Sequence, residues 1–114
     1  MESTPKDIKL FVTKNGKRPF LDWLKDLKDQ RAKQKIQIRI DRLSLGNPGH
    51  TNSVGEGVQE LKIDYGPGFR VYFGWEGNEI VILLLGGDKS TQDDDIKKAK
   101  GYWKEYKEDK KYAD

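Results

Sequence analysis

The sequence predicts a single α+β domain over residues 1–114, with an N-terminal strand, a helical hairpin, a three-stranded antiparallel meander and a C-terminal helix. The length suits one domain and leaves no room for a second. Three apolar segments separated by glycine turns indicate the meander, and two segments with helical apolar spacing indicate the hairpin before it. Charged residues make up 36% of the chain and hydrophobic residues 34%, so the core must be small.

The first third of the chain contains the strand and the hairpin. Alternating apolar residues over 8–12 predict the strand, with Phe11 on its second face. A proline at the first helical position and an apolar stripe predict a short helix over 19–29. A second helix, with a basic outer surface, is predicted over 30–45. The Gly-, Asn- and Ser-rich segment 46–57 is typical of a loop.

The meander is predicted from Val58–Asp64, Phe69–Glu76 and Glu79–Leu85. For its first hairpin the hydrophobic pattern favours a three-residue loop, which pairs Ile63 with Val71, Lys62 with Tyr72 and Asp64 with Arg70. In the second hairpin, a two-residue turn at Gly77-Asn78 sets Phe73 opposite Ile82. The C-terminal helix follows, and Ser90 or Thr91 can cap it.

The composition excludes several classes of site. The chain has no cysteine, which excludes disulfides and thiolate metal centres, and its one histidine, His50, excludes motifs built on two. The longest apolar run has six residues, Ile80–Leu85, far short of a membrane span. With no basic-then-apolar leader at the start, we expect a cytoplasmic protein that does not meet a membrane and needs no cofactor.

Charge is unevenly distributed along the chain. Residues 1–45 contain 12 basic and 6 acidic side chains, whereas residues 46–91 contain 3 and 6. A basic half indicates a polyanion or an acidic protein as partner, although lysine-rich helix surfaces are also common without one.

The second face of the meander gathers polar side chains. These are Lys62, Arg70 and Lys89, accompanied by Glu60, Asp64 and Tyr72. Three cations on one sheet face could grip a phosphodiester. The structural alternative is that Arg70 simply pairs with Asp64 or Glu60.

Other motifs have plainer interpretations. The turn at 86–91 lacks the glycines of a phosphate loop. Asp93, Asp94 and Asp95 point about 100° apart on a helix, so capping explains them better than a metal ion does. His50 could be a general base, but an ordinary loop histidine is the favoured interpretation, because no second catalytic group is fixed near it in the sequence.

Four segments, in this order, carry a family resemblance. They are Phe20-x-x-Trp23-Leu24, Gly55–Ile63, Gly66–Phe73 and Leu83–Gln92. Together with the order of elements they resemble the RelE/ParE toxin superfamily, in particular its HigB/RelE-like addiction module killer proteins. The similarity covers about residues 6 to 107.

The resemblance implies a toxin of a type II toxin–antitoxin pair. Its partners would be a cognate helix-turn-helix antitoxin, mRNA in the ribosomal A site and ribosomal RNA, with operator DNA bound only through the antitoxin complex. The implied activity is a metal-independent, ribosome-dependent mRNA endoribonuclease, or mRNA interferase. In that reaction a 2′-hydroxyl attacks the adjacent phosphate, with a base, an acid and stabilisation of the developing charge.

The resemblance also implies roles for particular residues. Lys62, Arg70 and Lys89 match the family's catalytic cations, and either lysine could be the base or the acid. The implied RNA-binding residues are Glu60, Tyr72, Gln92, Arg39 and Arg42. Two positions depart from the family pattern. Glu60 stands where the family often has a lysine, and Gln92 lies at the start of the last helix, where RelE-like members tend to carry a tyrosine or histidine. Tyr72 or His50 could substitute for the latter in stacking on a base.

Two other functions stay open on the sequence alone. A ParE-like toxin would inhibit DNA gyrase without cleaving anything, although such proteins usually lack the basic set on the sheet face. A catalytically inactive partner would only join its antitoxin on operator DNA.

Overall fold

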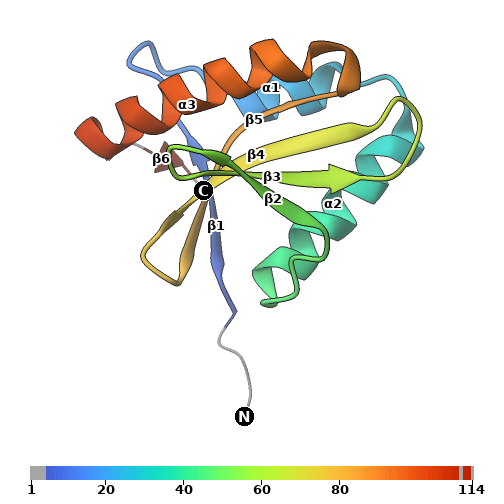
Figure 1. The fold of residues 1–114 in the computed structure, drawn as a ribbon, viewed down its shortest axis with the longest axis horizontal. Helices are drawn as coiled ribbons and strands as arrows, with labels where there is room; N and C mark the ends of the chain where they lie inside the picture. Colours follow the sequence, from blue (N-terminus) through green and yellow to red (C-terminus); the bar gives the residue numbers. More distant parts are fainter. Residues whose placement is uncertain (1–4, 111, 114) are drawn as a thin grey trace.

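A computed structural model describes residues 5–110 and 112–113 and confirms the α+β class (Figure 1). Its strands are β1 (Asp7–Phe11), β2 (Thr51–Gly55), β3 (Val58–Ile63), β4 (Phe69–Glu76), β5 (Ile80–Gly87) and β6 (Tyr112–Ala113). Its α-helices are α1 (Pro19–Asp26), α2 (Gln30–Ser44) and α3 (Gln92–Asp109), and a 3-10 turn, η1 (Lys89–Thr91), leads into α3.

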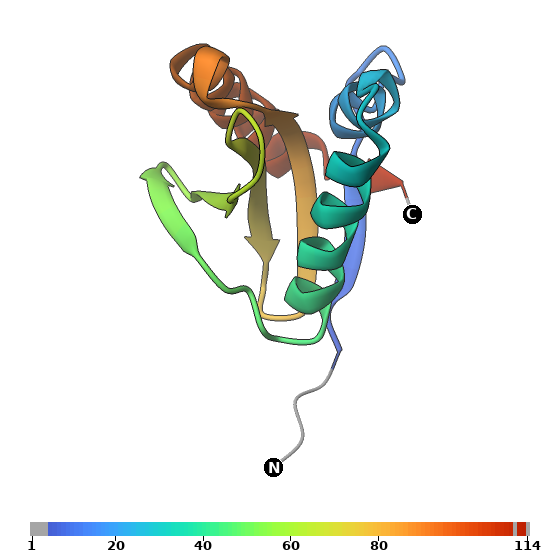
Figure 2. The same ribbon diagram turned by 90° about the vertical axis from the view of Figure 1, so that its right-hand side faces the viewer.

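All six strands form one sheet, in the order β2-β3-β4-β5-β1-β6. The first strand, β1, runs parallel to β5 in the interior of the sheet, and its other neighbour, β6, is antiparallel. The helical hairpin of α1 and α2 covers one face, and α3 crosses the other (Figure 2). The sheet is therefore the middle layer of three.

Each face of the sheet has its own apolar core. Beneath α1 and α2, residues such as Phe20, Ile36 and Leu43 pack on Leu61 and Val71. On the opposite face, α3 places Ala99, Trp103 and Tyr106 on Val58, Tyr72 and Leu84. The predicted division of β1 is confirmed, because Ile8 and Leu10 pack against the first core and Phe11 belongs to the second.

The hairpin helices begin where their sequences favour it. Pro19 opens α1, where its fixed backbone angle suits the first turn. The carboxylate of Asp29 caps α2 by accepting hydrogen bonds from the backbone N–H groups of Arg31 (3.0 Å) and Ala32 (3.1 Å). The bond from Ala32 is the main reason that the pKa of Asp29 lies below its usual value. The first helix is three residues shorter than predicted and ends at Asp26.

The register predicted for the first hairpin is wrong by two residues. Lys62 pairs with Arg70, Ile63 with Phe69 and Leu61 with Val71, so the loop has five residues, 64–68, in place of three. A shift of two keeps every side chain on its predicted face, because side chains alternate with a period of two. It does remove the predicted pairing of Asp64 with Arg70.

The register predicted for the second hairpin is also wrong, by one residue from Phe73 to Glu76. Phe73 pairs with Leu83, and a bulge between Tyr72 and Phe73 then sets Tyr72 opposite Leu85 and Arg70 opposite Gly87. An odd shift exchanges the two faces of a strand. Ile82 and Leu84 therefore lie in the core under α3, on the face opposite to the one predicted.

Two strands lie where the sequence indicated a loop or a tail. The segment expected to be an irregular loop, 46–57, contains β2, an edge strand paired with β3. Near the C-terminus, the short β6 pairs with β1.

The cap predicted for the last helix differs as well. Thr91 precedes α3 but makes no side-chain cap, and its hydroxyl donates to the carboxylate of Asp95 at 2.5 Å. Asp88 caps η1 instead, by accepting from the Ser90 N–H at 2.8 Å.

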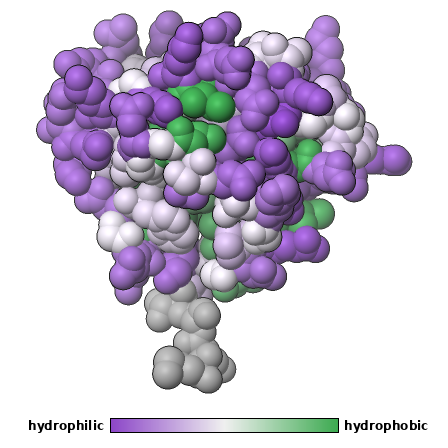
Figure 3. Space-filling view, in the orientation of Figure 1, coloured by the Kyte–Doolittle hydropathy of each residue, from purple (hydrophilic) through white to green (hydrophobic). Residues whose placement is uncertain are grey.

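The face of the molecule seen in Figure 3 is mainly hydrophilic. In the view of Figure 3, apolar areas are small and separated by polar side chains. Within the described ranges, no helix combines the length and the apolar character needed to span a membrane.

Candidate functional site

Two of the three predicted catalytic cations lie side by side. Lys62 on β3 and Arg70 on β4 are directly opposite each other in the register and so point to the same face. Both line an open pocket of about 460 Å³. The remaining lining residues are Arg39, His50, Ile63, Asp64, Gly68 and Phe69. The sheet thus brings these two cations together at the end of β3 and the start of β4.

The guanidinium of Arg70 is held in place from two directions. Its Nη1 donates to the carbonyl oxygen of Gly68 at 2.6 Å, and its Nε lies 3.9 Å from the carboxylate of Glu60. The residue is only 8% exposed, and Nε has no hydrogen-bond partner among the described residues. The pairing of Arg70 with Glu60, one of the two structural alternatives, is therefore present, but at a distance too long for a hydrogen bond.

Lys89 reaches the same region from η1. Its backbone N–H donates to the Pro67 carbonyl at 3.4 Å. A methyl group placed on Gly68 would lie 3.1 Å from Arg70 Nη1 and 3.8 Å from the Lys89 Cβ, so Gly68 separates the two cations. The exposed Lys89 side chain lines a neighbouring hollow of about 400 Å³ with Gln92. Lys89 is therefore adjacent to the pocket that holds Lys62 and Arg70, and it does not line that pocket.

The predicted RNA-binding residues Glu60 and Tyr72 are buried beneath the start of α3. Glu60 is 2% exposed and its carboxylate accepts from Gln92 Nε2 at 2.9 Å, while Tyr72 is fully buried. Burial, and then the negative charge of Glu60, raise the pKa of the Tyr72 hydroxyl well above its usual range. In this arrangement neither side chain is open to a ligand. Of the two, Glu60 faces Arg70 from the inner side.

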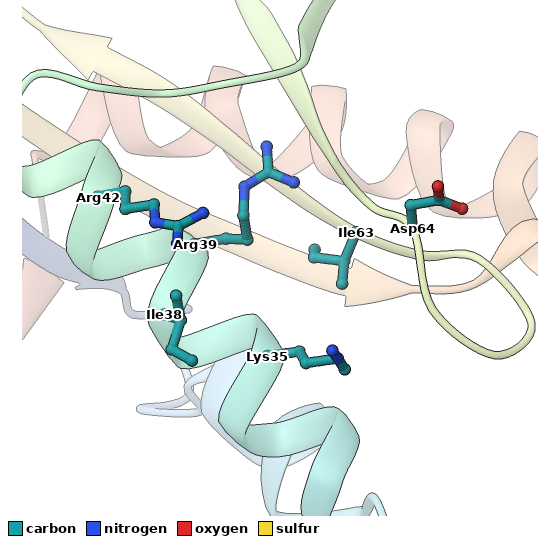
Figure 4. A pocket seen from close by; sticks show the side chains of 6 residues that line it. All are labelled: Lys35, Ile38, Arg39, Arg42, Ile63 and Asp64. Carbon is teal, nitrogen blue, oxygen red and sulfur yellow. The ribbon is translucent and has the colours of Figure 1, made fainter.

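The predicted pair Arg39 and Arg42 lies along α2, in a groove between that helix and β3 (Figure 4). The groove is also lined by Lys35, Ile38, Ile63 and Asp64. In Figure 4 the Arg39 side chain extends from α2 toward β3. Because Arg39 and Asp64 also line the pocket of Lys62 and Arg70, the groove and the pocket are continuous.

From the sequence, His50 is favoured as an ordinary loop residue and is only an alternative for this site. The structure sets it at the pocket of Lys62 and Arg70, opposite Lys62. The only indication in the sequence was that residue 50 is a histidine. The pairing of β2 with β3, which brings it to the pocket, could not be predicted. Among the described residues, no three His, Cys, Asp or Glu side chains cluster as metal ligands would.

Comparisons with known proteins give two findings. A family model described as "Phage derived protein Gp49-like (DUF891)" matches residues 22–114 of this chain. A protein of Haemophilus influenzae (strain Rd), whose name is "Uncharacterized protein", is 57% identical over 81 residues. That alignment covers 71% of this chain and 82% of the relative. The region that the family model matches includes the strands from β2 to β6.

Proposed function

The chain belongs to the Gp49-like family of phage-derived proteins, a toxin–antitoxin-associated family related to RelE-like toxins, and from this premise we propose that it is a toxin that cleaves mRNA on the ribosome. The partner that neutralises it is a cognate helix-turn-helix antitoxin. Its reaction is a metal-independent endoribonuclease step, in the cytoplasm and in the ribosomal A site.

One observation carries this proposal: Lys62 and Arg70 are cross-strand neighbours in one pocket, with Lys89 next to them across Gly68. Arg70 comes from a strand buried on both faces, and its guanidinium is fixed by the Gly68 carbonyl. A guanidinium fixed in this way can stabilise charge on a phosphate without reorganising during the reaction.

The pocket and the adjacent Lys89 supply cations that suit this reaction. A 2′-hydroxyl gives its proton to a base and attacks the adjacent phosphorus, and the bond to the 5′-oxygen breaks as that oxygen takes up a proton. Arg70 stabilises the negative charge that develops between these steps. Lys62 and Lys89 stand on either side of Arg70, where each can bind a phosphate oxygen or protonate the leaving oxygen. The groove with Arg39 and Arg42 gives the RNA backbone a basic path into the pocket.

The test is induced expression followed by mapping of transcript 5′ ends, in parallel with cleavage by purified protein on translating ribosomes. We expect cleavage within translated frames that survives EDTA. Arg70→Ala should lower the rate by about 10²- to 10³-fold, the usual effect of removing one fixed charge-stabilising group. Lys89→Ala should also lower it, and Lys98→Ala, on the exposed side of α3, is the matched control.

Thermal unfolding and antitoxin binding of each variant show that the fold is retained. Intact transcripts together with inhibited gyrase would overturn the proposal in favour of a ParE-like activity. Full cleavage by the Arg70→Ala variant would overturn the site.

A further inference from the structure

The pocket of Lys62 and Arg70 has a third polar member from a third segment of chain. Because Thr51 of β2 pairs with Leu61, the next position places His50 opposite Lys62, whose N–H donates to the His50 carbonyl at 3.3 Å. Lys62 in turn pairs with Arg70. His50, Lys62 and Arg70 thus form one row across the sheet, and all three line the same pocket.

The backbone of His50 is held by Arg39. The Arg39 guanidinium donates to the carbonyl oxygens of Pro48 (3.1 Å), His50 (3.4 Å) and Lys62 (2.5 Å), and so ties the segment before β2 to β3. Gly49 has a φ of +69°, and a methyl group there would lie 2.9 Å from Arg39 Nη2. The histidine therefore follows a glycine that lets the chain lie directly against the guanidinium.

Charged side chains from three elements and one loop surround His50 in the pocket. Arg39 lies on α2, Lys62 on β3 and Arg70 on β4, and one carboxylate, that of Asp64, lies in the loop after β3. Lysine and arginine side chains ordinarily keep their protons at neutral pH, so they are poor proton acceptors there. An imidazole both accepts and donates a proton in that range. A carboxylate such as that of Asp64 can also accept a proton, but it is ordinarily a weaker base than an imidazole. Of the residues that line the pocket, His50 is thus the one best suited to accept a proton.

We propose that His50 is a catalytic residue of this site and is the base that takes the proton from the attacking 2′-hydroxyl of RNA, an inference that rests on the proposed function. The 2′-oxygen uses the released electron pair to bond to phosphorus, and the bond from phosphorus to the 5′-oxygen breaks. The leaving oxygen takes a proton from Lys62 or Lys89. The products are a 2′,3′-cyclic phosphate and a 5′-hydroxyl end, and no other reactant is needed.

The test measures cleavage of a defined mRNA on translating ribosomes by the purified full chain, as a function of pH. Wild type is compared with His50→Gln, His50→Ala and a matched control, Asn47→Ala, which changes an exposed residue of the same segment that does not line the pocket. We expect His50→Gln to lower kcat by about 10²- to 10⁴-fold, with KM changed less than about threefold, and to remove the acidic limb of the pH profile. Added imidazole should restore cleavage by His50→Ala.

The outcomes separate the two proposals. If wild type cleaves and His50→Gln keeps both its rate and its acidic limb, the role of His50 is overturned and the proposed function stands. A rise in KM alone, or a loss that imidazole does not restore in a folded variant, also overturns the role as base. If wild type does not cleave, the proposed function fails and this inference fails with it. Unfolding curves that match wild type show that the variants are folded.

Discussion

The two faces of the sheet are built differently, although they share the same strands. Beneath α1 and α2 the buried side chains are apolar throughout the described chain. The face under α3 has an apolar core too, but the described buried charged residues, Glu60, Arg70 and Asp95, all lie on this side. The comparison indicates that one face mainly stabilises the fold, while the other gives up part of its core to hold a polar site.

Leu61 and Glu60 are neighbours in β3 that point to opposite faces of the sheet. The largest effect on stability should come from changing Leu61. Leu61→Ala removes a fully buried side chain from the core under α1 and α2 and should lower the free energy of unfolding by about 2–5 kcal/mol. Urea denaturation measures the change. Cleavage per folded molecule should stay near that of wild type.

Glu60→Gln should show the reverse pattern. It keeps the shape of the residue that Gln92 and Arg70 contact, and it removes the charge facing Arg70. We expect a smaller loss of stability than for Leu61→Ala, because the ion pair is long and the Gly68 carbonyl still holds Arg70, and a cleavage rate lowered by about tenfold. The proposed difference between the faces would be contradicted if Leu61→Ala and Glu60→Gln had the same ratio of stability loss to loss of cleavage.

A smaller loss of stability than that of Leu61→Ala should come from changing either of two glycines, one on each face of the sheet. A methyl group on Gly86 would lie 2.1 Å from the ring of Trp23 of α1, and one on Gly74 would lie 2.6 Å from the ring of Trp103 of α3. Gly86→Ala and Gly74→Ala should each lower the free energy of unfolding by about 1–3 kcal/mol, and Gly86→Ala should cost more because its overlap is deeper.

Gly101→Ala is the matched control for this pair. Gly101 lies within α3, and a methyl group there would meet nothing within 4 Å. This change should stabilise the protein by up to about 1 kcal/mol, since alanine favours a helix. A stabilising Gly86→Ala would show that the contact between α1 and the sheet is looser than described.

The smallest effect concerns pH and the face under α3. Burial raises the pKa of Tyr72 strongly and that of Tyr106 to about 12, whereas an unfolded tyrosine titrates near 10. The native state therefore keeps protons that the unfolded chain releases, so stability falls as pH rises from about 10 toward 12. By pH 11 each of these two tyrosines should contribute a loss of roughly 1 kcal/mol.

Tyr72→Phe should reduce this alkaline loss, because it removes one of the two groups. At neutral pH it should be neutral or slightly stabilising, since the Tyr72 hydroxyl has no hydrogen-bond partner within the described residues. Denaturation at pH 7, 10 and 11 measures both effects. An unchanged pH slope would contradict the cause assigned here.

The sequence predicts the elements of this fold better than their registers. Helices with a clear stripe, such as α2, and the three strands of the meander were predicted correctly, because apolar periodicity and glycine turns mark them. The run Ile80–Leu85 has no polar residue to mark a face, and since β5 is buried on both sides, hydrophobicity could not choose between registers one residue apart. A bulge next to Tyr72 added a second shift.

The candidate site could be predicted only in part, for a related reason. Lys62 and Arg70 lie on adjacent strands of one hairpin, so alternation alone predicts a shared face. The edge strand β2 is polar and short, and without it nothing brings His50 to Lys62. The burial of Glu60 and Tyr72 depends on where α3 crosses the sheet, which is a property of the assembled layers.

The place of β1 in the sheet has a consequence for how the protein is made. Among the described strands β1 comes first in the sequence, yet its neighbours in the sheet are β5 and β6, which come last. The pairing of β1 with β5 must therefore wait until β5 has been translated, and pairings this distant in sequence form slowly. Completion of the sheet is thus a late step in the synthesis and folding of this domain.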